Sequence, residues 1–92
     1  MNSFDQQALT MAAIDLLAFN PDDVWVAQLA NGGNASRGQV LAYCTAEAGL
    51  SDDARDAVSQ AVNELIMDFN LPLRVPYSFD PEPGSVDPAE TA

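Results

Sequence analysis

The clearest hydrophobic pattern in the chain lies at residues 52–69. Its apolar residues recur at helical spacing and form one stripe, made up of Ala54, Val58, Ala61, Val62, Leu65 and Phe69. Ser51 is a suitable N-cap, and Asp52 and Asp53 suit the positive end of a helix dipole. The pattern therefore predicts an amphipathic helix whose striped face lies in the core.

The first apolar segment, residues 4–19, has no polar face. Ten of the twelve residues at 8–19 are apolar. Ser3 and Gln6 have the spacing of a capping box, so this helix is expected to begin there. A helix that is apolar on all sides must pack against other elements on all sides. We therefore predict that it lies between other elements or is shared with a second chain.

Two shorter helices are predicted between these long ones, at about 21–30 and 37–48. Pro21 suits a first helical position, and the Asn-Gly-Gly sequence that follows residue 30 suits a left-handed helix end. Ser36 is a suitable N-cap for the second short helix, and Gly49 is a suitable residue to end it. The turn signals thus divide the middle of the chain into two helical segments.

The same stretch leaves a second interpretation open. The β-branched and aromatic residues at 24–26 have high strand propensity, so 24–30 could pair with 39–44 as a hairpin in an α+β fold. The loop at 31–38 is longer and less turn-like than a hairpin favours, and it therefore supports the helical interpretation.

From residue 71 the hydrophobic period changes to two. The alternating apolar residues are Leu71, Leu73, Val75, Tyr77 and Phe79. The prolines between them exclude a central strand, so we predict an extended segment with one buried face, lying along the helices or at a sheet edge. Residues 80–92 are predicted to form a disordered acidic tail.

These segments predict an all-α fold. It is a small bundle of about four helices with a C-terminal extended segment, in a single domain at 1–79 followed by the tail at 80–92. Four residues are predicted to contribute to the stability core: Leu16, Val58, Val62 and Leu65.

The charge inventory excludes much chemistry. The chain has fourteen Asp and Glu, three Arg and neither Lys nor His, which gives a net charge of −11. It therefore has no His-based catalytic triad, no Schiff-base lysine and no P-loop lysine, and its field repels nucleic acid. The single Cys44 forms no internal disulfide, which fits a reducing compartment. Since no signal peptide or membrane-spanning run is evident, we predict a soluble cytoplasmic protein.

No cofactor or metal site is predicted. Asp52, Asp53 and Asp56 lack the pattern of a calcium-binding loop, and acids at a helix start complement its dipole. Cys44 has no His to act as its base, so a buried structural thiol is expected. No pair of carboxylates stands out as an acid and base. The protein is accordingly predicted not to be an enzyme.

Residues 40–58 resemble a helix-turn-helix over about twenty residues. Thr45 and Arg55 depart from the small and apolar residues usual at their positions. The helix that would read DNA also opens with three carboxylates, at residues 52, 53 and 56, which would face phosphates. A plain helical hairpin is therefore the expectation for this stretch.

In size and charge the chain is similar to small acidic phage-type inhibitors that mimic DNA, including anti-restriction and anti-CRISPR proteins. This class-level resemblance implies a non-enzymatic protein-binding module that occupies the basic, nucleic-acid-binding surface of a partner protein. The predicted partner-binding residues are Asp22, Asp23, Trp25, Asp52, Asp53, Asp56, Glu64 and Asp68.

Other interpretations are also compatible with the sequence. The apolar first helix and the extended segment would also suit an acidic helical adaptor or assembly subunit of a virion or nucleoprotein complex, and a homodimer is possible. Ten Asp against four Glu, with no Lys, would suit adaptation to high salt instead.

Overall fold

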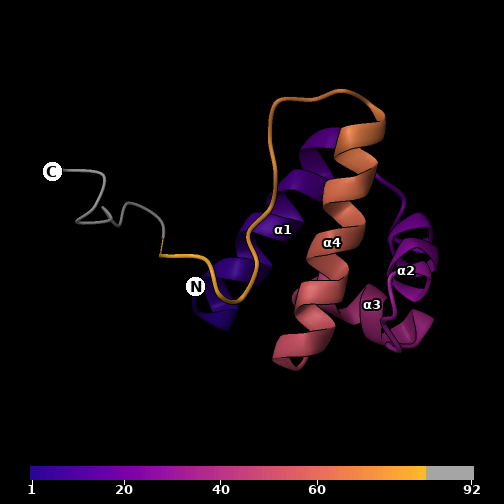
Figure 1. The fold of residues 1–92 in the computed structure, drawn as a ribbon. Helices are drawn as coiled ribbons and strands as arrows, with labels where there is room; N and C mark the ends of the chain where they lie inside the picture. Colours follow the sequence, from indigo (N-terminus) through magenta and orange to yellow (C-terminus); the bar gives the residue numbers. More distant parts are fainter. Residues whose placement is uncertain (83–92) are drawn as a thin grey trace, which may run out of the picture.

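A computed structural model of the chain describes residues 1–82 (Figure 1). It contains four helices, which are α1 (Ser3–Leu17), α2 (Pro21–Ala30), α3 (Arg37–Cys44) and α4 (Asp52–Asp68). No strand is present within the described range. The all-α prediction is confirmed, and the alternative hairpin between 24–30 and 39–44 is wrong.

Local capping explains why the ambiguous middle segments are helical. The Asn20 side chain accepts a hydrogen bond from the Asp22 amide at 2.9 Å, and Pro21 occupies the first helical position of α2. Ser36 and Gln39 form a complete capping box at the start of α3. These bonds satisfy amides that a hairpin would have to pair across a long loop, so they outweigh the strand propensity of 24–26.

Two predicted helix boundaries are wrong. Asn2, rather than Ser3, caps α1, because its Oδ1 accepts the Asp5 amide at 2.8 Å. The third helix ends at Cys44 instead of continuing to about Ala48. The reason is a left-handed residue at position 46, with φ of 60°, which redirects the chain before Gly49 is reached.

The helices are arranged around α4, which packs against α1 on one side and α2 on the other (Figure 1). The short α3 lies across the lower end and packs against both α1 and α2. All four helices contribute to one hydrophobic core, which consists of Ala13, Ile14, Val24, Ala35, Val40, Tyr43, Cys44, Val58, Ala61, Val62, Ile66 and Val75.

The predicted core is partly correct. Val58 and Val62 are fully buried, as expected. Leu16, in contrast, is 75% exposed, and Leu65 is only half-buried at the edge of the core. Ile66 takes the central position at the C-terminal end of α4. The buried face of α4 is thus rotated from the predicted stripe, since α4 is also covered by residues 71–82.

Residues 71–82, the C-terminal segment, return along α4 toward the N-terminus (Figure 1). Side chains of α4 bind this segment in place of a neighbouring strand. Asn63 donates to the carbonyl of Val75 at 3.1 Å and accepts its amide at 2.7 Å, while the Tyr77 hydroxyl donates to Gln60 at 2.6 Å. The prediction that an extended segment lies along the helices is confirmed.

The predicted one-sided burial of this segment is wrong in part. Val75 is buried, but Leu73 is 39% exposed and Phe79 is 76% exposed. The alternation fails at Phe79 because the amide of Asp80 donates to the carbonyl of Tyr77, which closes a turn that keeps Ser78 bound to Asp56 of α4 and leaves Phe79 at the surface.

The start and the end of the described chain lie together. The Met1 amine donates to the carbonyl of Ser78 at 3.1 Å, and the Asn2 side chain donates to Glu82 at 3.2 Å. The tail predicted at 80–92 therefore begins with three residues placed beside α1. The rest of that prediction lies outside the described residues. Within residues 1–82, no helix has the length and apolar character needed to cross a membrane.

Candidate partner-binding surface

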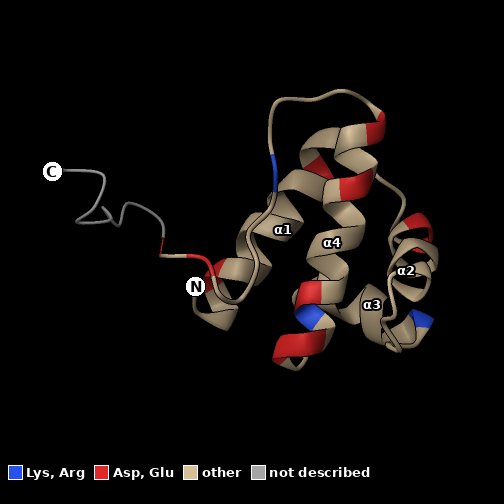
Figure 2. Ribbon diagram, viewed as in Figure 1, with Lys and Arg blue, Asp and Glu red and all other residues tan. Residues whose placement is uncertain are grey.

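Every side-chain cation of this protein is bound to one of its own carboxylates. The chain has three arginines and no lysine. Each arginine forms an ion pair, and the three pairs are Arg37 with Asp22, Arg55 with Asp52 and Arg74 with Asp80. Figure 2 shows how few the basic positions are among the acidic ones. The charge left free at the surface is therefore negative.

Five carboxylates have no ion pair or hydrogen bond within residues 1–82, and all five are exposed. They are Asp15, Asp23, Glu47, Asp53 and Asp68. Three of them, Asp23, Asp53 and Asp68, belong to the predicted partner-binding set. Acidic positions occur at both ends of α4 and at the start of α2 (Figure 2). These unpaired groups are the ones that a basic partner can neutralise without breaking internal contacts.

Two of the predicted acids on α4, Asp52 and Asp56, bind partners within the protein. Asp52 pairs with Arg55, whose guanidinium is buried against α1. The Arg55 Nε donates to Gln6 at 2.9 Å, and its other donors reach Asp52 and the carbonyl of Leu50. This buried arginine joins α1, α4 and the turn before α4.

Asp56 extends the same network to the C-terminal segment. Its carboxylate accepts the Ser78 amide and hydroxyl, both at 2.6 Å, and the Gln6 side chain at 3.1 Å. Ser59 donates to the carbonyl of Pro76 at 2.7 Å beside it. Asp56 thus has little capacity left for a partner, although the sequence placed it with its exposed neighbours.

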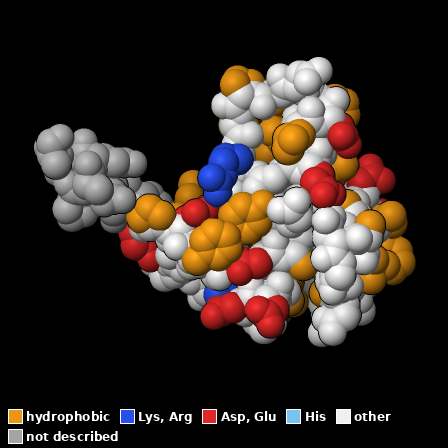
Figure 3. Space-filling view, viewed as in Figure 1, with side chains coloured by type: hydrophobic (Ala, Val, Ile, Leu, Met, Phe, Trp, Pro, Cys, Tyr) orange, Lys and Arg blue, Asp and Glu red, His pale blue; other side chains and the backbone are white. Residues whose placement is uncertain are grey.

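The remaining predicted acids of α4 follow its outer side. Asp53, Glu64 and Asp68 are separated by eleven and four residues, so they fall within one face of the helix and span about 22 Å. Glu64 accepts hydrogen bonds from Asn31 at 2.8 Å and Gln60 at 3.3 Å, whereas the other two are free. Figure 3 shows separate acidic patches near the two ends of the exposed helix rather than one dense cluster.

The three predicted residues of α2 also differ in whether they are free to bind a partner. Asp22 is held by Arg37, and that hydrogen bond and charge raise the pKa of Arg37. Asp23 is exposed and free. Trp25 is half-buried against the core, and its indole nitrogen is shielded from solvent without a partner among the described residues. Trp25 therefore contributes to packing, and Asp23 is the accessible member of the three.

A first groove brings Asp23 and Asp68 together. It lies where the end of α1, the start of α2 and the end of α4 meet, and its volume is about 570 Å³. We call it the phenylalanine groove, because the rings of Phe19 and Phe69 stack there at 5.9 Å. Its lining residues are Leu17, Ala18, Phe19, Asn20, Asp23, Leu65, Asp68, Phe69 and Leu71. It combines an apolar lining with two free carboxylates and contains no cation.

A second groove, of about 670 Å³, lies between the loop at 31–34 and the start of α4. Asp53 and Asp56 line it together with the stacked rings of Tyr77 and Phe79, whose centroids are 5.2 Å apart. Of its two acids only Asp53 is free, because Asp56 is bound to the C-terminal segment. This groove therefore offers one carboxylate to a partner.

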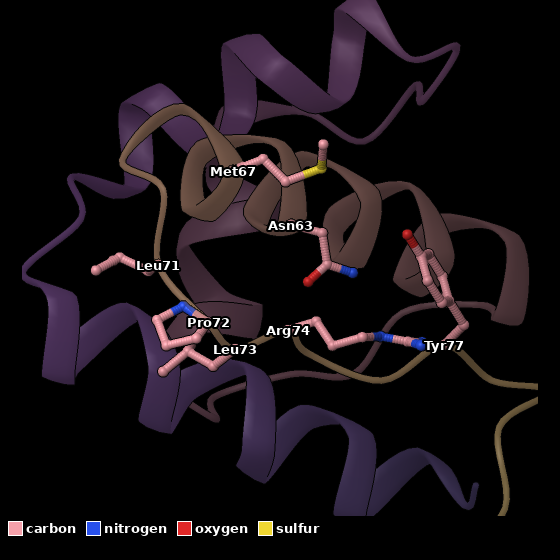
Figure 4. A pocket seen from close by; sticks show the side chains of 7 residues that line it. All are labelled: Asn63, Met67, Leu71, Pro72, Leu73, Arg74 and Tyr77. Carbon is pink, nitrogen blue, oxygen red and sulfur yellow. The ribbon is translucent and has the colours of Figure 1, made fainter.

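A third groove, of about 550 Å³, lies between α4 and the C-terminal segment (Figure 4). Arg74 extends toward Tyr77 there, with its guanidinium carbon 5.4 Å from the ring centroid, and its charge is paired with Asp80. Met67 and Leu73 supply apolar surface. No carboxylate lines this groove, so it is poorly suited to a basic ligand.

The buried titratable groups of α3 lie away from these grooves. Burial raises the pKa of the Cys44 thiol to about 11, with a contribution from the charge of Asp15, and burial raises the pKa of Tyr43 to about 12. Both groups are protonated at neutral pH, which leaves Cys44 a weak nucleophile. Within residues 1–82, no three acidic or thiol side chains gather closely enough to hold a metal ion.

Sequence reasoning missed three features of this surface. The ion pair of Arg37 with Asp22 depends on the packing of α2 and α3, and that of Arg74 with Asp80 on the course of the C-terminal segment, whereas only the i, i+3 spacing of Asp52 and Arg55 was visible in the sequence. The stacking of Phe19 on Phe69 joins residues fifty positions apart, so no local signal marked it. Asp15 and Glu47 carried no pattern that separated them from other acids.

Comparisons with protein-family models, with curated proteins and with solved structures gave no match to this chain.

Proposed function

We propose that this protein is a non-enzymatic, acidic protein-binding module that modulates a partner by occupying a basic, nucleic-acid-binding surface. The observation that supports this proposal is the pairing of all three arginines with internal carboxylates. With no lysine in the chain, every free charged side chain found at residues 1–82 is a carboxylate. Such a surface repels phosphate and attracts Lys and Arg.

The arrangement of the acids supports binding rather than stability as their role. Asp23, Asp53 and Asp68 form no internal bond within the described chain, and mutual repulsion among surface acids destabilises a small domain. A partner that supplies cations removes this repulsion. Association should therefore be fast and should weaken as salt is added.

One observation favours a second candidate function, that of an acidic adaptor or assembly subunit. Large apolar side chains of α1 lie at the surface, with Phe4 77% exposed and Leu16 75% exposed. Large exposed apolar patches are typical of protein–protein interfaces. In this case the acidic charge would serve solubility, and α1 would carry the interaction.

Affinity capture from a lysate of the native host separates the two functions. The parent protein is compared with Asp23→Asn/Asp53→Asn/Asp68→Asn and with Phe4→Gln/Leu16→Gln, after thermal melts show that both variants fold. We expect the acid variant to lose the captured protein and the α1 variant to retain it. A duplex DNA oligonucleotide, or an increase in salt from about 50 to about 300 mM, should release the same protein.

The opposite pattern overturns the proposal. Capture that is lost only in Phe4→Gln/Leu16→Gln, and that resists both DNA and salt, would establish the adaptor function instead. Capture that is equal for all three proteins would show that neither surface is used.

A further inference from the structure

We infer that the phenylalanine groove is the anchor site for a basic amphipathic segment of the partner protein. An apolar side chain of that segment inserts over Phe19 and Phe69, and flanking lysine or arginine side chains pair with Asp23 and Asp68. This inference rests on the proposed function and deepens it, because it names which part of the acidic surface selects the partner and what chemistry it selects.

The apolar part of the groove is accessible and shaped by three elements. Phe69 is 64% exposed although it stacks on Phe19, and the half-buried residues Leu17, Leu65 and Leu71 lie beside the two rings. An inserted aliphatic or aromatic side chain would bury the exposed face of Phe69. Since a few buried apolar anchors supply most of the binding energy of a typical interface, one anchor here can contribute much of a specific contact.

The position of Asp68 points to a cationic ligand. Asp68 is the last residue of α4, where the helix dipole is negative and a carboxylate is unfavourable. No basic residue lies in the last turn of α4, and none lies in the last turn of α1, which ends at the same groove. Two helix C-terminal ends and Asp68 therefore converge with no basic side chain among the groove residues, and the positive end of α2 that also lies there is already complemented by its own Asp22 and Asp23. Asp23 adds a second carboxylate from the start of α2.

The cations that this groove lacks must come from another protein. All three arginines are already paired, and residues 83–92 contain acids and no Lys or Arg. Neither a segment of the same chain nor a second copy can supply a free side-chain cation to Asp23 and Asp68. Charge complementarity thus favours a foreign basic segment over self-association.

The inference can be tested with synthetic peptides and the full chain. The probe is an amphipathic peptide of Leu-Lys-Lys-Leu repeats, and one control peptide carries serine at each leucine, so that its charge is unchanged. A second control peptide carries glutamine at each lysine. Binding is measured by calorimetry at two salt concentrations, and backbone amide shifts locate the contact.

Matched variants distinguish the groove from general acidity. Asp23→Asn/Asp68→Asn removes two charges at the groove, and Asp15→Asn/Glu47→Gln removes two exposed, unpaired charges elsewhere. We expect the first pair to weaken binding of the leucine–lysine peptide about tenfold and the second about twofold. Phe69→Ser should abolish the preference for this peptide over the serine control. Asp68→Asn alone should leave the melting temperature unchanged or slightly raised, because it removes an unfavourable charge at a helix end.

Each other outcome has a defined meaning. Equal weakening by the two charge pairs, or shift changes centred away from Leu17, Phe19 and Phe69, overturns the groove inference and leaves the proposed function intact. If neither the leucine–lysine peptide nor the serine control binds at low salt, the groove inference and the proposed function are both overturned. Equal binding of the glutamine control, or a dimer in sedimentation that Phe69→Ser dissolves, shows an apolar docking face and also overturns the inference.

Discussion

The two long helices use their side chains in opposite ways. In α4 the apolar residues Val58, Val62 and Ile66 are fully buried, and acids lie outside. In α1 the fully buried residues include Gln6 and Thr10, whereas large apolar residues lie at the surface, among them Phe4, Leu9 and Leu16. The pattern of hydrophobic residues therefore identifies most of the inner face of α4, whereas on α1, which has no polar face in the sequence, it marks no inner face.

The difference arises where the two helices meet. Gln6 of α1 accepts a hydrogen bond from the buried Arg55 and donates to Asp56 and Ser59 of α4. A buried guanidinium requires partners for its donors, and α1 supplies one of them by turning Gln6 inward. Its apolar residues are then left on the outer surface. One buried charge can thus influence which face of a neighbouring helix turns inward.

The largest expected effect on stability comes from truncating a buried apolar side chain of α4, and it is compared with truncation of an exposed one of α1. Ile66→Ala should destabilise the protein by about 2–5 kcal/mol, because it removes a fully buried side chain from the core. Leu16→Ala should change the free energy of unfolding by less than about 0.5 kcal/mol, since Leu16 is 75% exposed. Urea unfolding measures both. Similar losses for the two variants would contradict the orientation of α1.

The next prediction concerns the hydrogen bond from Arg55 of α4 to Gln6 of α1. Arg55→Met should cost about 3 kcal/mol, because Gln6 and the carbonyl of Leu50 lose a buried charged donor. Arg37→Met is the matched control, since Arg37 is an exposed arginine that is also paired with an Asp, and its unfolding curve should overlay the parent curve. A stable Arg55→Met variant would show that the polar network does not orient α1.

A smaller effect compares two acids of α4 that the sequence does not distinguish. Asp56→Asn should lose about 1–2 kcal/mol, because it weakens the bonds that hold Ser78 and Gln6. Asp53→Asn should change stability by a few tenths of a kcal/mol at most, since Asp53 is exposed at the helix start. Thermal melts at one pH suffice. Equal losses would place Asp53 in the structural network as well.

An effect confined to alkaline pH, and absent at neutral pH, concerns the position of α1 over α3. The folded state favours the neutral thiol of Cys44, since its pKa rises from 9.0 to about 11. The unfolded chain therefore releases this proton first, and stability should fall as pH rises from about 9 toward about 11. Cys44→Ala should reduce the fall, with the remainder due to Tyr43, whose pKa is raised in the same direction.

A single charge on α1 supplies the control for this titration. Asp15→Asn should lower the pKa of Cys44 slightly, because the Asp15 carboxylate opposes thiolate formation. Thiolate absorbance against pH reports the change. An unaltered titration would indicate that α1 does not hold Asp15 near α3.

Local interactions in the sequence determined the helices and their number. The caps at Asn20, Ser36 and Ser51, together with the periodicity of 52–69, require only residues a few positions apart, so they can be recognised without a fold. The net charge and the lack of Lys and His likewise follow from composition alone. These features supported the all-α fold and the proposal of a basic partner.

Tertiary structure alone decided which acids are free and which face of α1 is buried. Asp52, Asp53 and Asp56 look alike in sequence, but Arg55 and Ser78 bind two of them and leave the third in solvent. Asp23 and Asp68 become neighbours in one groove only after α2 and α4 pack together. A carboxylate is structural or available according to its partners, and those partners are brought to it by packing between residues distant in sequence.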